Sequence, residues 1–289
     1  MKPAPFEYHA PERLDEAAQV LADHADEAKV LAGGQSLIPM LALRLTSFPH
    51  LVDLGRVADL RGVSQTNGSV TIKAMTTQAT IEKDASVGAA VPLLAKAIPL
   101  IGHFQIRNRG TVGGSIAHAD PASELPAVAL ALDATISLTG KGGTRTVAAA
   151  DFFQGTWTTS MAEDEILSAV EFPTWSGRTG FGVEELARRH GDFAIAGVVA
   201  GIELDGDVVK RAAIALFGMD STPLRASAAE TALVGTSGTA ADLEAAGQAA
   251  TADLDPPADI HASGAYRKKV GAVLVARAVT QALEEARRG

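Results

Sequence analysis

The sequence predicts an α+β protein built from two successive domains. Its 289 residues leave room for two domains of ordinary size. Strand and helix patterns alternate near the N-terminus, whereas beyond about residue 182 three apolar strands are followed by three helical stretches. A break containing Pro, Gly and Ser, from Pro173 to Gly180, separates the two regions. We therefore place a domain boundary at this break.

Composition excludes several classes of protein. Hydrophobic residues make up 47% of the chain and charged residues 20%, as in ordinary globular domains. The net charge of 25 − 34 = −9 opposes binding to nucleic-acid phosphates. No run of 18 apolar residues predicts a membrane span, and the N-terminus lacks the hydrophobic region of a signal peptide. We expect a cytoplasmic protein that has no membrane span and binds no nucleic acid.

The chain contains no cysteine. Disulfide bonds and thiol catalysis are therefore excluded. An iron–sulfur cluster held by cysteines of this chain is excluded as well.

The first fifty-odd residues predict a small β-α-β unit. Apolar residues from Leu14 to Ala22 recur at helical spacing, and short apolar runs on either side of Ser36 suit strands. The elements expected are a helix over 11–25, a strand over 28–32, a helix over 37–45 and a strand over 50–54.

The middle of the chain predicts hairpins and helices around a longer loop. Asn67-Gly68 favours a type I′ turn, Thr76-Thr77 can cap a helix, and Pro92 suits a first helical turn. The strands expected are 63–65, 69–74, 134–139, 144–147 and 165–172, and the helices are 77–84, 91–101 and 123–132.

The C-terminal region predicts a small antiparallel sheet with a helical cluster. Asp205-Gly206 supplies a hairpin turn between two apolar runs. The strands expected are 182–187, 195–204 and 208–217, and the helices are 225–234, 239–250 and 263–288. Because these helices are rich in alanine, we expect them to pack rather than to form sites.

Two glycine pairs about eighty residues apart carry the strongest functional signal. The first, Gly33-Gly34, lies between a predicted strand and a helix that Ser36 can cap; the second, Gly113-Gly114, follows Thr111-Val112. Glycine permits close backbone approach, and successive N–H groups at such turns bind anions. Two such loops can hold a diphosphate from two sides. Each alone is equally consistent with a tight turn, and neither matches a P-loop or Rossmann motif.

The paired segments Ala32-Gly-Gly-Gln-Ser36 and Thr111-Val-Gly-Gly-Ser115 resemble the FAD-binding medium subunit of molybdenum hydroxylases. This group includes xanthine, carbon monoxide and nicotine dehydrogenases, and the resemblance extends from about residue 3 to 285. It implies an FAD-binding domain of the PCMH (vanillyl-alcohol-oxidase-like) type over residues 1–175, with subdomains of about 1–55 and 56–175. It also implies a C-terminal domain of the carbon monoxide dehydrogenase flavoprotein type over residues 178–287.

The resemblance also implies a set of residues that bind FAD, with neither catalytic residues nor metal ligands. Arg188 to Ala194 resembles a segment that approaches the flavin in relatives, where Phe193 can cover the ring. The implied set is Ala32, Gly33, Gly34, Gln35, Ser36, Leu37, Ile101, Thr111, Gly113, Gly114, Ser115, Glu124, Leu167, Asp192 and Phe193.

Several of these residues have a second interpretation. Glu124 can accept hydrogen bonds from sugar hydroxyls or simply begin a helix, and Phe193 can equally be a core aromatic. Arg107 and Arg109 can neutralise the diphosphate or pair with acidic groups at a subunit interface.

The remaining candidates also have structural interpretations. Ile101 and Leu167 suit a hydrophobic core, and Asp192 can anchor a neighbouring arginine. His103 and His118 lack the spacing of metal ligands, which favours packed histidines.

The function implied by the resemblance is electron transfer. The chain would hold FAD non-covalently and pass electrons from [2Fe–2S] clusters of a small partner subunit to an external acceptor. A large partner subunit would carry the molybdopterin cofactor, in a dimer of heterotrimers. The alternatives are a self-contained FAD-dependent oxidase or dehydrogenase and a module without redox activity. Substrate and acceptor stay open, because the substrate would bind another polypeptide.

Overall fold

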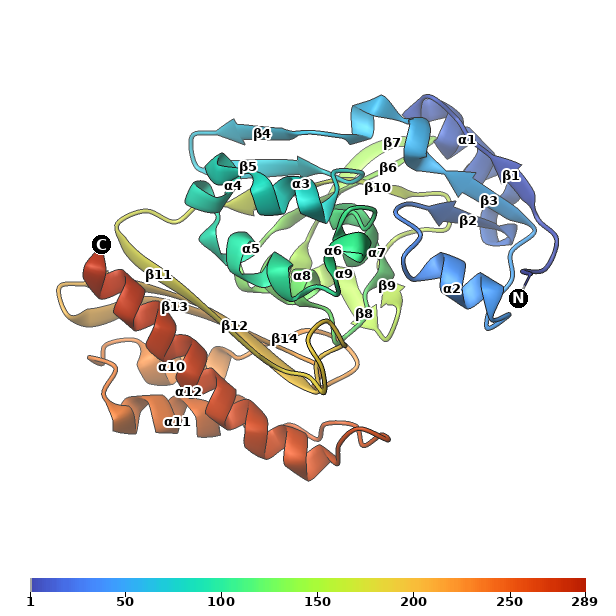
Figure 1. The fold of residues 1–289 in the computed structure, drawn as a ribbon. Coiled ribbons are helices and arrows are strands. Elements are labelled where there is room, and N and C mark those ends of the chain that lie inside the picture. Colours follow the sequence, from blue (N-terminus) through green and yellow to red (C-terminus); the bar gives the residue numbers. More distant parts are fainter. Residues whose placement is uncertain (1) are drawn as a thin grey trace.

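A computed structural model describes residues 2–289 (Figure 1). The N-terminal part is a parallel sheet in the order β1-β3-β2, made of β1 (Glu7–His9), β3 (His50–Asp53) and β2 (Ala28–Leu31). Helix α1 (Leu14–His24) packs on the sheet through Ala17 and Leu21, and α2 (Leu37–Ala42) links β2 to β3. The predicted β-α-β unit is confirmed. Strand β1 was not predicted from the sequence, because three residues are too few to reveal an alternation of apolar and polar side chains.

The middle of the chain forms a five-stranded antiparallel sheet. Its order is β4-β5-β10-β6-β7, and the two predicted hairpins are confirmed at β4/β5 and β6/β7. Its strands are β4 (Val63–Thr66), β5 (Ser69–Lys73), β10 (Ile166–Pro173), β6 (Thr135–Gly140) and β7 (Gly143–Ala148). A separate pair is formed by β8 (Phe153–Gly155) and β9 (Thr158–Thr159).

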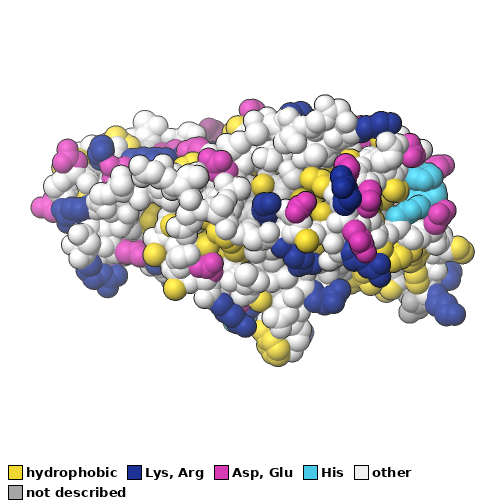
Figure 2. Space-filling view, turned by 90° about the horizontal axis from the view of Figure 1, so that it is seen from above, with side chains coloured by type: hydrophobic (Ala, Val, Ile, Leu, Met, Phe, Trp, Pro, Cys, Tyr) yellow, Lys and Arg dark blue, Asp and Glu magenta, His cyan; other side chains and the backbone are white. Residues whose placement is uncertain are grey.

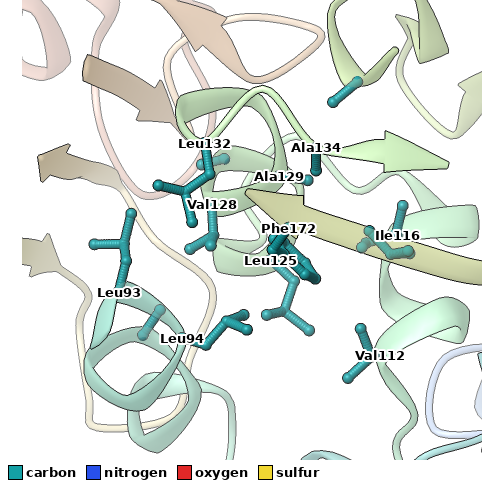
Figure 3. Packing of buried hydrophobic residues seen from close by; sticks show 14 of the residues in the cluster. Leu93, Leu94, Val112, Ile116, Leu125, Val128, Ala129, Leu132, Ala134 and Phe172 are labelled. Atoms are coloured by element: carbon teal, nitrogen blue, oxygen red, sulfur yellow. The ribbon is translucent and has the colours of Figure 1, made fainter. Parts of the chain in front are cut away.

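Short helices cover this sheet and bury its core (Figure 3). Leu125, Val128 and Leu132 meet Leu93, Leu94 and Phe172 there. The α-helices are α3 (Gln78–Lys83), α4 (Ala85–Ala90), α5 (Pro92–Ala97), α6 (Phe104–Arg107), α7 (Val112–His118), α8 (Glu124–Ala131) and α9 (Ala149–Phe152). The 3-10 helices of this half are η1 (Ala25–Glu27), η2 (Leu54–Arg56), η3 (Ala58–Leu60) and η4 (Ile98–Leu100).

The C-terminal part is an antiparallel sheet backed by helices, as predicted. The strands run in the order β11 (Arg178–Leu186), β12 (Ala196–Asp205), β13 (Val208–Phe217) and β14 (Leu224–Arg225). The long helix α12 (Gly264–Arg288) crosses this sheet beside α10 (Ser227–Leu233) and α11 (Ala240–Thr251) (Figure 1).

The break between the two halves is shorter than the sequence suggests. Strand β10 ends at Pro173 and β11 begins at Arg178, so four residues connect the sheets. The largest core cluster crosses this connection, because Phe181 and Phe217 pack with residues of the first half. Within residues 2–289, no helix combines the length and apolar character needed to span a bilayer.

Candidate functional site

The first glycine loop leaves β2 and enters α2. Gly34 has φ = +73°, a left-handed conformation that glycine adopts without strain. Ser36 is the N-cap residue, but its side chain makes no capping hydrogen bond, so that part of the prediction is wrong. The N–H groups of Gly33, Gly34, Gln35 and Ser36 donate no hydrogen bond within residues 2–289. The loop therefore offers a run of free backbone donors for an anion.

The second glycine pair lies in the first turn of α7 rather than in an open loop. Thr111 caps this helix, and its Oγ1 accepts a hydrogen bond from the Gly114 N–H at 3.0 Å. The N–H of Gly113 donates to the Ala74 carbonyl at 2.9 Å, and that of Val112 to the Thr76 carbonyl at 3.0 Å. Because these donors are engaged, the expectation that both loops present free N–H groups holds only for the first.

The two glycine segments lie directly against each other. A Cβ atom on Gly114 would lie 3.2 Å from the Ala32 side chain and 4.0 Å from the Gly33 nitrogen. A Cβ atom on Gly33 would lie 2.2 Å from the Arg109 carbonyl oxygen. Glycine at 33 and 114 thus permits the two segments to pack closely. The second segment lies directly behind the first and supports it.

A cavity of about 680 Å³ opens at this junction. Of the residues implied to bind FAD, Ala32, Gly33, Gly34, Gln35 and Thr111 line it. Further lining residues were not anticipated from the sequence: Leu31, Ile38, Pro39, Asp53, Gly55, Arg61, Met75, Thr77 and Asn108. One signal was available for Asp53. Asp53 is the last residue of β3, which pairs in parallel with β2. Because the carboxyl ends of parallel strands lie at the same edge of a sheet, Asp53 lies beside the loop that follows β2.

Two arginines give the cavity positive charge. The guanidinium of Arg61 donates to the carbonyls of Met75 at 3.2 Å and Gly55 at 3.0 Å, so both of these partners are neutral. Arg109 lines the cavity and forms no ion pair within residues 2–289. The free N–H groups and these cations together fit the diphosphate of a dinucleotide.

Arg107 has a structural role instead. It is buried, and its guanidinium forms two hydrogen bonds to Glu82, at 2.8 and 2.9 Å. It also donates to the carbonyl of Ile101 at 3.1 Å. Hydrogen bonding to Arg107 lowers the pKa of Glu82. Neither of the interpretations given to Arg107 from the sequence holds, because its partner is inside the chain.

Glu124 lies at the start of α8 and is 5% exposed. Its pKa is raised to about 8, mainly by burial and to a smaller extent by the nearby charges of Glu185 and Asp120. Burial also raises the pKa of Glu185 to about 7. The Oε2 atom of Glu185 has no hydrogen-bond partner in the described chain. At neutral pH Glu124 is therefore mainly a neutral carboxyl that can donate a hydrogen bond.

The other residues of the implied set lie outside the cavity lining. Leu167 is buried in the main core at 4% exposure, and Ile101 packs against that core. Asp192 and Phe193 belong to the loop between β11 and β12. Phe193 is 60% exposed, so it is not a core aromatic. Ser36 and Leu37 adjoin lining residues in the chain, whereas Gly113, Gly114 and Ser115 follow the lining residue Thr111 along α7.

The loop that carries Phe193 lies close to the segment before α6. A Cβ atom on Gly191 would lie 2.9 Å from the Gly102 carbonyl, and the His190 and His103 rings stack at 6.2 Å. His118 stacks on Trp157 at 6.2 Å, and burial lowers its pKa. His103 and His118 thus each stack on an aromatic ring.

The fold and the cavity define a dinucleotide-binding protein, and comparison with known proteins gives its family. The family model for the FAD-binding domain in molybdopterin dehydrogenase matches residues 4–175. The model for the carbon monoxide dehydrogenase flavoprotein C-terminal domain matches residues 182–282. The chain belongs to the family of FAD-binding medium chains of molybdenum hydroxylases, so FAD is its cofactor and it is an oxidoreductase subunit.

Relatives match over nearly the whole chain. The medium chain of carbon monoxide dehydrogenase from Hydrogenophaga pseudoflava is 38% identical to this chain, and the match covers 98% of each of the two chains. A subunit of 6-hydroxypseudooxynicotine dehydrogenase from Paenarthrobacter nicotinovorans is 37% identical, with 99% of this chain and 97% of that one covered. A solved structure of quinoline 2-oxidoreductase from Pseudomonas putida 86 superposes with a TM-score of 0.95 at 37% identity and 99% coverage of both chains.

Proposed function

We propose that this chain is the electron-transfer subunit of a heterotrimeric molybdenum hydroxylase. In this role it receives electrons from [2Fe–2S] clusters of a small partner subunit and delivers them to an external acceptor. A large partner carries the molybdopterin cofactor. The observation that carries the proposal is the cavity between the two glycine segments, which combines free backbone donors with unpaired arginine charge. No triad or carboxylate dyad for substrate chemistry lines that cavity within residues 2–289.

The residues of this chain bind and orient the cofactor, and FAD supplies the redox chemistry when bound. The N–H groups of Gly33 to Ser36 would donate to the diphosphate, and Arg109 would balance its charge. Phe193 has an exposed ring that can cover one face of the flavin. Glu124 offers a neutral carboxyl, which can donate a hydrogen bond at pH 7.

Membership of the family supports a multi-subunit assembly. The absence of cysteine fits clusters that are carried elsewhere, because such clusters are normally held by cysteine thiolates. The substrate of the assembled enzyme would bind the large subunit. We infer a dimer of heterotrimers by analogy with the family, and the external acceptor stays open.

Expression of the chain alone and with its partners tests the proposal. The isolated chain should bind FAD in a form that acid precipitation releases, and it should oxidise no substrate. Mixing with the iron–sulfur and molybdopterin subunits should restore flavin reduction by the substrate of the assembled enzyme. Turnover by the chain alone would favour a self-contained oxidase, and a chain that binds no flavin would refute both roles.

A further inference from the structure

Three of the seven histidines converge in the N-terminal sheet, although they are far apart in the sequence. One nitrogen from each of His9, His24 and His50 lies within 4.8 Å of the other two. His9 Nε2 and His50 Nδ1 are 3.1 Å apart, and the rings of His24 and His50 stack at 3.7 Å. Figure 2 shows histidine side chains gathered in one patch at this end of the molecule, with acidic side chains beside them.

The local fold explains why these residues meet. Glu7 and His9 are two residues apart on β1, so their side chains point to the same face of the sheet. Glu7 pairs with His50 in the parallel ladder, which places all three side chains together. His24 reaches them from the last turn of α1, the helix that packs on this sheet.

A carboxylate and a helix end make this position favourable for a cation. The Glu7 carboxylate lies 3.8 Å from His9 Nε2 and 3.7 Å from His50 Nδ1. Helix α1 has eleven residues, and the negative end of its dipole lies at His24. The side chains of His9 and His50 are 19% and 14% exposed, so the ligands are partly shielded and still reachable from solvent.

We propose that His9, His24, His50 and Glu7 form a binding site for one divalent transition-metal ion of the Zn²⁺ type. Three imidazole nitrogens with one carboxylate are a ligand set that Zn²⁺ accepts in tetrahedral geometry. Zn–N bonds of about 2.0–2.1 Å place ligand nitrogens roughly 3.4 Å apart, and the His9–His50 pair, at 3.1 Å, is close to that spacing. Rotation of the His24 ring out of its stack completes the set.

The site is distinct from the FAD cavity and does not depend on the proposed function. None of its four ligands is among the residues that line the cavity. A bound ion would connect β1, α1 and β3, three elements that surround the core of the N-terminal sheet. The site thus has a structural effect, since an ion that binds only the folded state stabilises it.

Calorimetric titration of chelator-treated, tag-free full-length protein with ZnCl₂ tests the proposal. The protein should bind one equivalent at micromolar Kd or tighter, with a higher melting temperature. His24→Ala and His50→Ala should each weaken binding at least tenfold, and Glu7→Gln should weaken it less. His261→Ala, in the C-terminal half, is the matched control and should bind as the wild type does. MgCl₂ should give no heat, because Mg²⁺ prefers oxygen ligands.

Two results would overturn the site. One is a wild-type protein that binds no Zn²⁺ under these conditions. The other is a His24→Ala variant that binds Zn²⁺ with wild-type stoichiometry and affinity. If His50→Ala does not fold, Co²⁺ substitution in the wild type decides instead. Intense visible d–d absorption indicates tetrahedral coordination by this site, whereas the weak bands of an octahedral ion contradict it. Flavin absorbance should be the same in all variants.

Discussion

At the scale of single residues, glycine determines how closely the two glycine segments pack. Gly114 has the Thr111 hydroxyl and the Ala32 side chain as its nearest neighbours, so any Cβ atom there pushes the two glycine segments apart. Gly33 is confined more tightly, because a Cβ atom there would lie 2.2 Å from the Arg109 carbonyl oxygen. The same residues that permit close packing therefore shape the cavity.

Gly114→Val should lower FAD affinity roughly 100-fold, the loss expected when about two charge-assisted hydrogen bonds are displaced. Fluorescence titration with FAD measures this, and circular dichroism checks that the fold persists. Gly142→Val is the matched control, because a Cβ atom at Gly142 has no neighbour within 4 Å. Stoichiometric flavin in Gly114→Val would refute the diphosphate assignment.

Arg109→Ala should weaken FAD binding about tenfold or more, as expected for loss of a charged hydrogen-bond donor. The weakening should be smaller at high salt, where the charge of Arg109 is screened in the wild type. Titration at two salt concentrations measures both effects. Arg277→Ala, an exposed arginine on α12, serves as the control. An unchanged Kd would remove Arg109 from the site.

Glu124 should make the FAD-free protein less stable as pH rises. Its pKa is raised to about 8 in the folded state from 4.5, so stability is full below about pH 4.5 and is lost as pH rises towards 8. Glu124→Gln should reduce the loss of unfolding free energy between pH 6 and 8 by about 1–2 kcal/mol in urea denaturation. Glu171→Gln, on an exposed position of β10, should leave the loss unchanged. The same pH dependence in Glu124→Gln and wild type would contradict a buried neutral carboxyl.

At the scale of elements, the cap of α7 holds the second glycine segment in place. The Thr111 side chain accepts the hydrogen bond from the Gly114 N–H. Thr111→Val keeps the shape and removes the hydroxyl, so it should cost about 1 kcal/mol of unfolding free energy. Denaturant titration measures this, and Thr111→Ser should recover most of the loss. Equal stability of Thr111→Val and wild type would show that this cap is dispensable.

The elements also show how far sequence reasoning extends. The two hairpins and the β2-α2-β3 unit follow from local turn chemistry and short apolar runs, and all three are confirmed. Helix α7 was predicted as an open loop, because two adjacent glycines disfavour a helix and tertiary contacts override that preference. Arg61 and Asp53 reach the cavity through chain packing, for which the sequence contains no motif. The glycine loops were identifiable because their spacing resembles a known family.

At the scale of the whole molecule, the two halves share one core. Phe181 and Phe217 from the C-terminal sheet pack in the cluster that contains Leu125 and Val128. Arg225 adds a polar connection, since it donates to the Leu130 carbonyl at 2.9 Å and to Asp133 at 2.8 Å. The halves should therefore not unfold independently.

A fragment of residues 1–175 should consequently lose stable tertiary structure, because it exposes buried apolar surface of that shared core. The full chain should unfold in a single calorimetric transition. Calorimetry of both proteins measures this. A fragment that melts cooperatively at the temperature of the full chain would show that the two halves are independent domains.

We propose that the first glycine loop binds the FAD diphosphate while the second segment supports it. The structure of the FAD complex measures this directly, through the distances from the diphosphate oxygens to the backbone nitrogens of Gly33, Gly34, Gln35 and Ser36. We predict distances of about 2.7–3.2 Å to at least two of these nitrogens, with the Arg109 guanidinium alongside. A diphosphate bound outside the cavity between Ala32 and Thr111 would rule out this mode of binding.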